Sequence, residues 1–286
     1  MPTTQLTYGL EIEATQIDVS AAAALRESQI DWHHDGSLLS DSGVKLPKGI
    51  GGELVSPVLA ASFTCGESGF NAVLTSDTAN TDLVYQMCAA ARKVNTTCGI
   101  HIHLGLPDDN GVSKWKPEHI RTFLAIGLML EEKLFEVCPP SRAKSPHCRR
   151  IAEVYTQRDL GSFYPIGVVK PNKRENPKRY CWLNLIETKR VGNKPSRQFG
   201  AGPALGTIEI RMLGCTIRHG YVDAWVKLWL KVAGLVSSVP ASLAMLQCGF
   251  SDYLQQEFEA LQRCRNSCAG SELLSECISL APSVDT

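Results

Sequence analysis

Residues 7–15, TYGLEIEAT, alternate apolar and polar side chains over the length of one β-strand. Successive side chains of an extended chain point to opposite faces, so Glu11 and Glu13 share the face opposite the apolar one. The apolar set is Tyr8, Leu10, Ile12 and Ala14. The two carboxylates then stand roughly 7 Å apart along the strand. An edge strand wetted by solvent and a functional site both fit this face, so the other strands have to distinguish them.

Two later segments repeat the alternation with other ionisable residues. In IHIHL, residues 100–104, His101 and His103 lie on the face opposite the aliphatic side chains. In TIEIRM, Glu209 and Arg211 lie together in the same way. Imidazole, carboxylate and guanidinium groups are therefore expected on the polar faces of these strands.

Two further segments add candidates to this set. Glu53 lies on one face of GELVS, and Asn184 shares a face of YCWLNL with Tyr180 and Trp182. Arg179 stands at the entrance of the latter strand. We expect a loop over residues 192–206, between this strand and TIEIRM.

Helical patterns in the rest of the chain predict what covers the apolar faces. Residues 77–94, 117–137 and 221–237 have apolar side chains at helical spacing, and Pro117 suits a first helical turn. Together with the strands they predict an α+β protein, in which helices pack on the apolar face of an antiparallel sheet. We find no internal repeat and no linker that requires a boundary. We therefore expect one domain over residues 1–286, mainly helical over 219–286.

Composition limits the class of partner and the compartment. The 29 Lys and Arg residues balance 29 Asp and Glu residues, which argues against a broad nucleic-acid surface. The longest tempting apolar run, AWVKLWLKVAGLV, carries Lys227 and Lys231 and is too short to span a membrane. No signal-peptide pattern opens the chain, and the 11 cysteines are scattered, as in reduced proteins. We expect a cytoplasmic protein that does not enter a membrane.

The residues gathered by the polar faces suit divalent cations and phosphate. They are Glu11, Glu13, Glu53, His101, His103, Glu209 and Arg211. Carboxylates at this density repel one another unless cations neutralise them, and Mg²⁺ is held by a few carboxylates with water and phosphate oxygens. Arg211 can bind a phosphoryl oxygen in a forked geometry. We expect a cation site, with room for two metals.

Six motifs in fixed order resemble a known family. They are YGLEIEA, HHDGSL, GGELVSP, GIHIHLG, RYCWLNL and GTIEIRMLGCT. The set is similar to the amidoligase family, within the carboxylate-amine ligases built like the catalytic domain of glutamine synthetase and glutamate-cysteine ligase. The resemblance implies a curved antiparallel sheet whose concave face binds ATP and Mg²⁺, with Mn²⁺ as an alternative. Such ligases phosphorylate a carboxylate, and an amine attacks the acyl phosphate.

The resemblance also implies roles for individual residues. Glu13 and Glu53 would hold one metal, and Glu11, His101 and Glu209 another that bridges the ATP phosphates. The catalytic set would be Arg211, Glu209 and Arg179, and the nucleotide-binding set His103, Arg211, Asn184 and Arg179. Asp35 in HHDGSL is explained equally well as a site residue or as part of a hairpin turn.

A basic segment in the middle of the chain adds weaker candidates. Its charges are Arg142, Arg149, Arg150, Lys178 and Arg179. They can present cations to ATP or to an acidic substrate, but for each residue taken singly a solvated loop is the favoured interpretation.

The expected function is an ATP- and Mg²⁺-dependent ligase that joins a small-molecule or peptide carboxylate to an amine, and a homo-oligomer is compatible with it. Two alternatives stay open. A metal-dependent hydrolase would use His101 and His103 around zinc. A non-catalytic scaffold would bind nucleotide without turnover.

Overall fold

The computed structural model describes most of the chain. The described residues are 3–18, 20–21, 25–64, 73–76, 78–107, 115–154, 180–184, 186–191, 194–199, 207–214, 216–238 and 254–269. Arg179 lies outside them.

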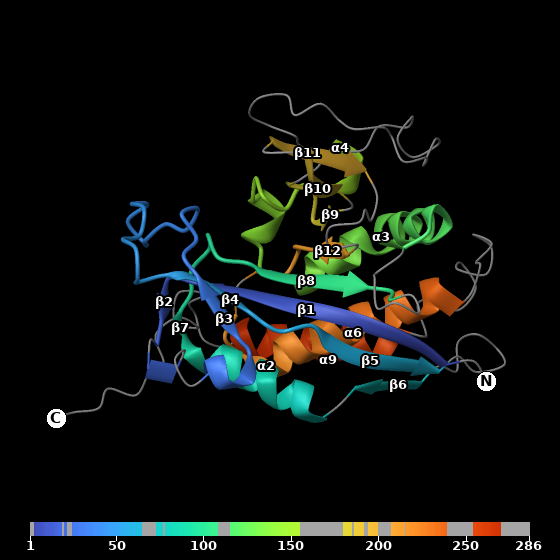
Figure 1. The fold of residues 1–286 in the computed structure, drawn as a ribbon, viewed down its shortest axis with the longest axis horizontal. Coiled ribbons are helices and arrows are strands. Elements are labelled where there is room, and N and C mark those ends of the chain that lie inside the picture. The colour runs from blue at the N-terminus through green and yellow to red at the C-terminus, as the bar shows by residue number, and fades with distance from the viewer. Residues whose placement is uncertain are drawn as a thin grey trace.

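The main sheet has eight strands arranged around the long first strand, β1 (Thr3–Ala14) (Figure 1). Its principal order is β3-β4-β1-β8-β12-β9, while β5 pairs with the first half of β1 and β6 pairs with β5. The other bounds are β3 Asp31–His33, β4 Gly52–Val55, β5 Leu59–Thr64, β6 Val73–Ser76, β8 Ile100–Gly105, β9 Leu183–Asn184 and β12 Ile208–Ile210. Every pairing of these strands is antiparallel.

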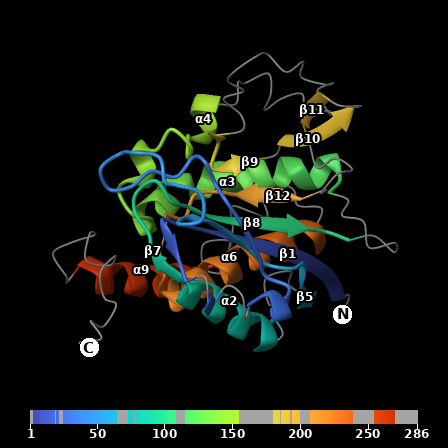
Figure 2. The same cartoon turned by 60° about the vertical axis from the view of Figure 1, so that its left-hand side comes forward.

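Helices lie against the sheet and complete an α+β fold, as the sequence predicted (Figures 1 and 2). They are α2 (Thr78–Ala90), α3 (Pro117–Val137), α6 (His219–Ser238) and α9 (Gln255–Ala269), with the short α4 (Ile151–Val154), η1 (Arg26–Ser28) and η2 (Arg142–Lys144). The predicted bounds of α3 are confirmed. None of the described helices is both long enough and apolar enough to cross a membrane.

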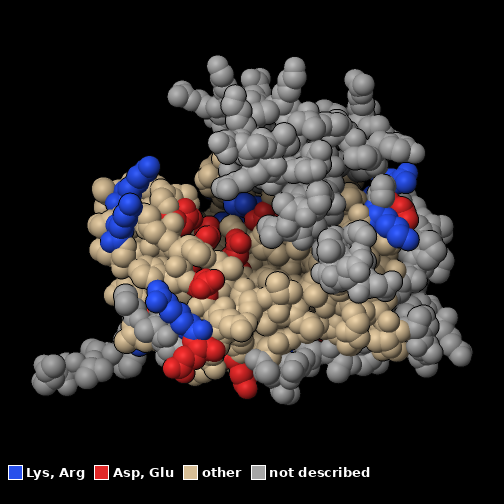
Figure 3. Space-filling view, viewed as in Figure 1, with Lys and Arg blue, Asp and Glu red and all other residues tan. Residues whose placement is uncertain are grey.

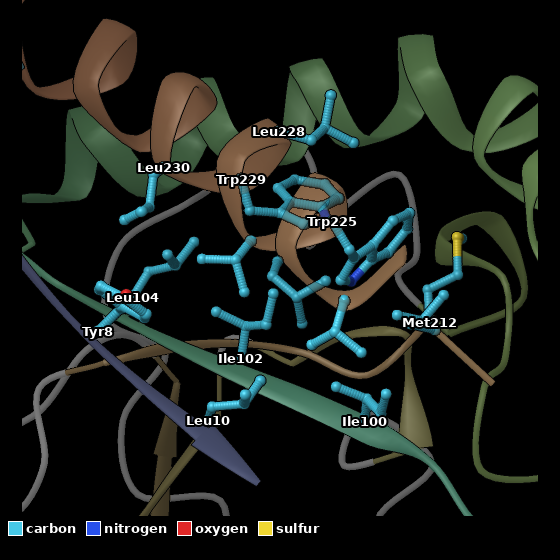
Figure 4. Packing of buried hydrophobic residues seen from close by; sticks show 14 of the residues in the cluster. Tyr8, Leu10, Ile100, Ile102, Leu104, Met212, Trp225, Leu228, Trp229 and Leu230 are labelled. Atoms are coloured by element: carbon cyan, nitrogen blue, oxygen red, sulfur yellow. The ribbon is translucent and has the colours of Figure 1, made fainter. Parts of the chain in front are cut away.

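The core lies between α6 and the apolar face of the sheet (Figure 4). Leu10 and Ile102 pair across β1 and β8, and both are completely buried. Trp225 and Trp229 of α6 face these strands and pack edge to face with ring centroids 5.9 Å apart. Burying each such side chain contributes on the order of 2 kcal/mol. The alternation in TYGLEIEAT is thus confirmed, because its apolar residues lie in this core.

Helix α2 is shorter than the sequence predicted. We expected a helix over residues 77–94, but it ends at Ala90, and β7 (Ala91–Lys93) follows. This strand pairs with β2 (Gln16–Ile17), which continues the chain beyond β1. Pairing with a neighbouring strand therefore overrides the helical spacing over the last residues.

The expected loop over residues 192–206 is wrong for its first half. Residues Lys194–Phe199 form β11, which pairs antiparallel with β10 (Ile186–Val191) in a separate two-stranded sheet beyond β9 (Figure 2). Gly192 and Asn193 separate the two strands. A two-residue connection of Gly and Asn is a known hairpin signal, and the sequence interpretation missed it.

The predicted alternation in YCWLNL also fails at one position. Trp182 was expected on the face of Asn184, but it is fully buried beside Trp229, with ring centroids 5.6 Å apart. Its indole nitrogen donates to the buried Glu131 carboxylate of α3 at 2.6 Å. Regular strand geometry begins at Leu183, so the period of two does not extend back to Trp182.

Candidate functional site

The strand register brings the predicted site residues onto one face of the sheet. Directly paired residues of neighbouring strands project to the same side, so their side chains are neighbours. The pairs are Glu13 with Glu53, Glu11 with His101, Glu209 with His103, and Glu209 with Asn184. Acidic side chains accordingly gather on the face shown in Figure 3, with basic side chains beside them. The face opposite the core is a cluster of ionisable groups.

One ligand group combines Glu11, His103 and Glu209. One oxygen or nitrogen from each lies within 4.8 Å of the others. Nε2 of His103 is 3.1 Å from Oε1 of Glu11, and its Nδ1 is 3.3 Å from the Thr207 hydroxyl. The Thr207 contact fixes the ring so that Nε2 faces the carboxylates. We call this set the His103 group.

A second ligand group consists of three carboxylates, Glu13, Asp35 and Glu53. Their oxygens also lie within 4.8 Å of one another. Glu13 is held by the backbone N–H of Gly99, which donates to its Oε2 at 2.5 Å. Asp35 follows β3 in a turn in which it accepts the backbone N–H and the hydroxyl of Ser37, both at 2.7 Å. We call this set the Asp35 group.

His101 lies between the two groups. Its Nδ1 is 3.0 Å from Oε2 of Glu11 and 3.5 Å from Oε1 of Glu209. Its Nε2 is 3.8 Å from Oε1 of Glu13. One buried imidazole therefore contacts carboxylates of both groups and sets their separation.

Glu209 and Arg211 form a fixed pair at the end of β12. Nη1 of Arg211 donates to Oε1 of Glu209 at 2.9 Å, and the amide of Asn184 donates to Oε2 at 2.6 Å. Nε of Arg211 is buried, and no described residue accepts a hydrogen bond from it. The guanidinium is thus oriented by Glu209, which Asn184 holds in turn.

In the Asp35 group, the surroundings disfavour the charged forms of Glu53 and Glu13. Burial is the main cause that raises the pKa of Glu53 to about 7, and the charges of Glu11, Asp35 and Glu13 raise it further. Burial also raises the pKa of Glu13. Burial and neighbouring carboxylates therefore both favour the protonated forms of Glu53 and Glu13.

The charges of the His103 group are balanced within the protein. Burial works to raise the pKa of Glu11, but the imidazoles of His101 and His103 outweigh it and hold this pKa well below the ordinary value. Burial acts in the same direction on Glu209, where Arg211 and the histidines lower the pKa. The pKa of His103 is raised in spite of burial, because Glu11 favours its charged form.

The donor atoms of both groups fit a divalent cation. Five carboxylates and one imidazole are hard or intermediate ligands, which suit Mg²⁺ or Mn²⁺. A cation in the Asp35 group would relieve the repulsion among its carboxylates.

The structure unites most of the residues expected from the sequence. Glu13 lies with Glu53 and Glu11 lies with Glu209, as expected from the family resemblance. Asp35 and His103 are the third members of the two groups. His101, which was expected with Glu11 and Glu209, lies 3.0 Å and 3.5 Å from their carboxylates.

Sequence reasoning missed the position of Arg142. The interpretation as a solvated loop is wrong for this residue, which is 3% exposed. Thr207 was also missed, although it immediately precedes the strand that carries Glu209.

The fold is α+β, and two acidic ligand groups and an arginine lie on one face of its sheet. Residues 32–233 match the family model described as "Putative amidoligase enzyme". This match covers more than half of the chain, and the protein belongs to the amidoligase family. No curated protein matches the chain. The family indicates an enzyme of the amide-bond-forming ligase kind.

Proposed function

We propose that the protein is an ATP- and Mg²⁺-dependent carboxylate-amine ligase, which forms an amide or isopeptide bond through an acyl phosphate. The observation that carries this proposal is the juxtaposition of two ligand groups and Arg211 on one face of the sheet. A nucleotide triphosphate requires such a set, because its phosphates must be both neutralised and oriented.

The Asp35 group and the His103 group would each hold one divalent cation. The bound cations would neutralise the nucleotide phosphates and the charge that develops during transfer. His101 would keep the two groups apart, since it contacts Glu11 and Glu13 at once. Mn²⁺ is the alternative to Mg²⁺, because it accepts the same oxygen and imidazole ligands.

Arg211 would bind the phosphoryl group that is transferred. Glu209 holds one of its amino groups, and Asn184 holds Glu209, so the guanidinium enters the reaction already oriented. Its remaining donors would stabilise the negative charge spread over the phosphoryl oxygens. Arg179 is proposed as a second cation, and His103 and Asn184 as neighbours of the nucleotide.

The reaction needs few proton-transfer groups. The substrate carboxylate attacks the γ-phosphorus of ATP, the bond to the β,γ-bridging oxygen breaks, and ADP leaves. The amine then attacks the carbonyl carbon, the C–O bond to phosphate breaks, and phosphate and one proton are released. The substrates are a small-molecule or peptide carboxylate and an amine. Six cysteines are free thiols, which supports a reducing cytoplasm as the proposed compartment.

Titration of ATP into the protein tests the proposal without knowledge of the substrates. With excess Mg²⁺ we expect binding that is lost without the cation and weakened at least about 10-fold in Glu11→Gln. Glu27→Gln is the matched control, because Glu27 is exposed on η1. Absence of binding at millimolar ATP together with tightly held zinc would favour the hydrolase alternative. Binding with no ADP release from any carboxylate and amine pool would favour the scaffold.

A further inference from the structure

Arg142 is a buried charge behind the candidate site. It lies in η2, which follows α3 and the prolines at 139 and 140, and it is 3% exposed. Its Nη2 donates to the carbonyl oxygen of Arg211 at 2.6 Å, and its Nε donates to the carbonyl oxygen of Met212 at 3.2 Å. One guanidinium therefore donates hydrogen bonds to two successive backbone carbonyls immediately after β12.

Two glycines, Gly99 and Gly214, leave space for the Arg142 side chain. A Cβ atom at Gly214 would stand 3.0 Å from Cγ of Arg142 and 3.0 Å from Cγ of Pro139. A Cβ atom at Gly99 would stand 3.3 Å from Nη2 of Arg142. Two glycines thus leave the space that the arginine stem and head occupy.

Among the described residues, no carboxylate forms an ion pair with Arg142. Its hydrogen-bond partners are the two backbone carbonyls and the thiol of Cys148. Oε2 of Glu13 also lies 3.3 Å from the Cβ position at Gly99. Burying a charged group among neutral partners is unfavourable. We therefore look for a role of the Arg142 guanidinium that depends on the groups it contacts.

The hydrogen bond from Arg142 to the carbonyl oxygen of Arg211 completes the restraint on the backbone of Arg211. The N–H of Arg211 donates to the carbonyl of Trp182 at 2.7 Å, and Arg142 holds the carbonyl of the same residue. This residue lies just beyond Ile210, where β12 ends, and the ladder no longer fixes its direction. Both peptide groups that flank the Arg211 side chain are then held by buried donors and acceptors.

We propose that Arg142 is a positioning residue that aims the Arg211 guanidinium at the bound phosphoryl group. This inference rests on the proposed function, which makes Arg211 the ligand of the transferred phosphate. Arg142 is too deeply buried to touch nucleotide, so it acts through the backbone of Arg211. Lysine keeps the charge but cannot form the forked contact with two carbonyls.

Arg142→Lys tests the proposal when nucleotide and cation binding are measured separately. We expect the affinity for Mg²⁺-ATP to fall about 10-fold, because Arg211 loses its alignment. We expect the affinity for Mn²⁺ alone to stay unchanged, because neither ligand group contacts Arg142. Arg92→Lys, an exposed arginine paired with Asp18, is the matched control and should change neither affinity.

Three results would decide against the inference or against its basis. Nucleotide affinity equal to that of the wild type overturns the role of Arg142 alone. A parallel loss of nucleotide and Mn²⁺ affinity shows a merely structural role and also overturns it. A wild-type protein that does not bind ATP overturns the proposed function as well. If Arg142→Lys fails to fold, Gly214→Ala replaces it, because the added methyl group displaces the Arg142 stem and keeps both arginines.

Discussion

The candidate site carries two ligand groups with similar spacing and different charge balance. In the His103 group, the imidazole and the Arg211 guanidinium neutralise Glu11 and Glu209 before any ligand binds. In the Asp35 group, three carboxylates face one another, and the charges of its neighbours raise the pKa of Glu53 beyond the effect of burial. The protein thus favours the charged forms of Glu11 and Glu209 and disfavours those of Glu13 and Glu53. Under the proposed function, a divalent cation would relieve the repulsion in the second group.

The largest effect is expected from variants that disrupt the His103 group or its partner Arg211. Arg211→Ala or Glu209→Gln should reduce ATP-dependent ADP release at least about 100-fold, because the charge that develops in phosphoryl transfer loses its oriented donor. The measurement is ADP release in a screen of carboxylate and amine pools, with circular dichroism to verify the fold. Retained turnover in either variant would count against the ligase assignment.

A smaller effect is expected on the thermal stability of the metal-free protein at pH 8. Its sign should differ between variants of the Asp35 group and variants of the His103 group. Glu53→Gln removes one of three repelling carboxylates and should raise the melting temperature by about 2 °C or more. Glu11→Gln removes the anion that His101 and His103 contact and should lower it by a similar amount. Thermal unfolding in EDTA measures both.

The same comparison has a simple control and a clear failure. Glu27→Gln changes an exposed carboxylate and should leave the melting temperature within about 1 °C. If Glu53→Gln and Glu11→Gln shift the melting temperature in the same direction, the two groups do not differ in charge balance as described.

The smallest effect is expected in the pH dependence of metal-free stability. The folded pKa of Glu53, about 7, exceeds its ordinary value of 4.5, so the folded state binds the proton more tightly. Its contribution is therefore fully present below about pH 4.5 and is lost as the pH rises to about 7. Stability should fall over this interval, and the fall should shrink in Glu53→Gln and with saturating Mg²⁺. Melting temperatures from pH 5 to 8 give the result, and an unchanged slope in Glu53→Gln would argue against the raised pKa.

Regular strands explain how much of the site was predictable. In β1 and β8 every second side chain faces the same way, so the sequence alone assigned Glu11, Glu13, His101 and His103 to one face. The grouping within that face depends on register, which a period of two does not fix. Glu209 pairs directly with His103, which adds this imidazole to the group that His101 also contacts.

The residues outside regular strands were the ones that the sequence could not place. Asp35 enters the site from a turn, and a period of two carries no information about the path of a turn. Arg142 is buried because the prolines and Gly214 shape the chain around it, and a charged residue in a basic segment gives no local sign of burial. Trp182 broke the alternation because the strand begins one residue later.

Anomalous diffraction from crystals grown with Mn²⁺ and a non-hydrolysable ATP analogue tests the central claim most directly. The account predicts two manganese peaks, one among Glu13, Asp35 and Glu53 and one among Glu11, His103 and Glu209, with the nucleotide phosphates facing Arg211. Absence of manganese from this face, or a nucleotide bound elsewhere, would contradict it.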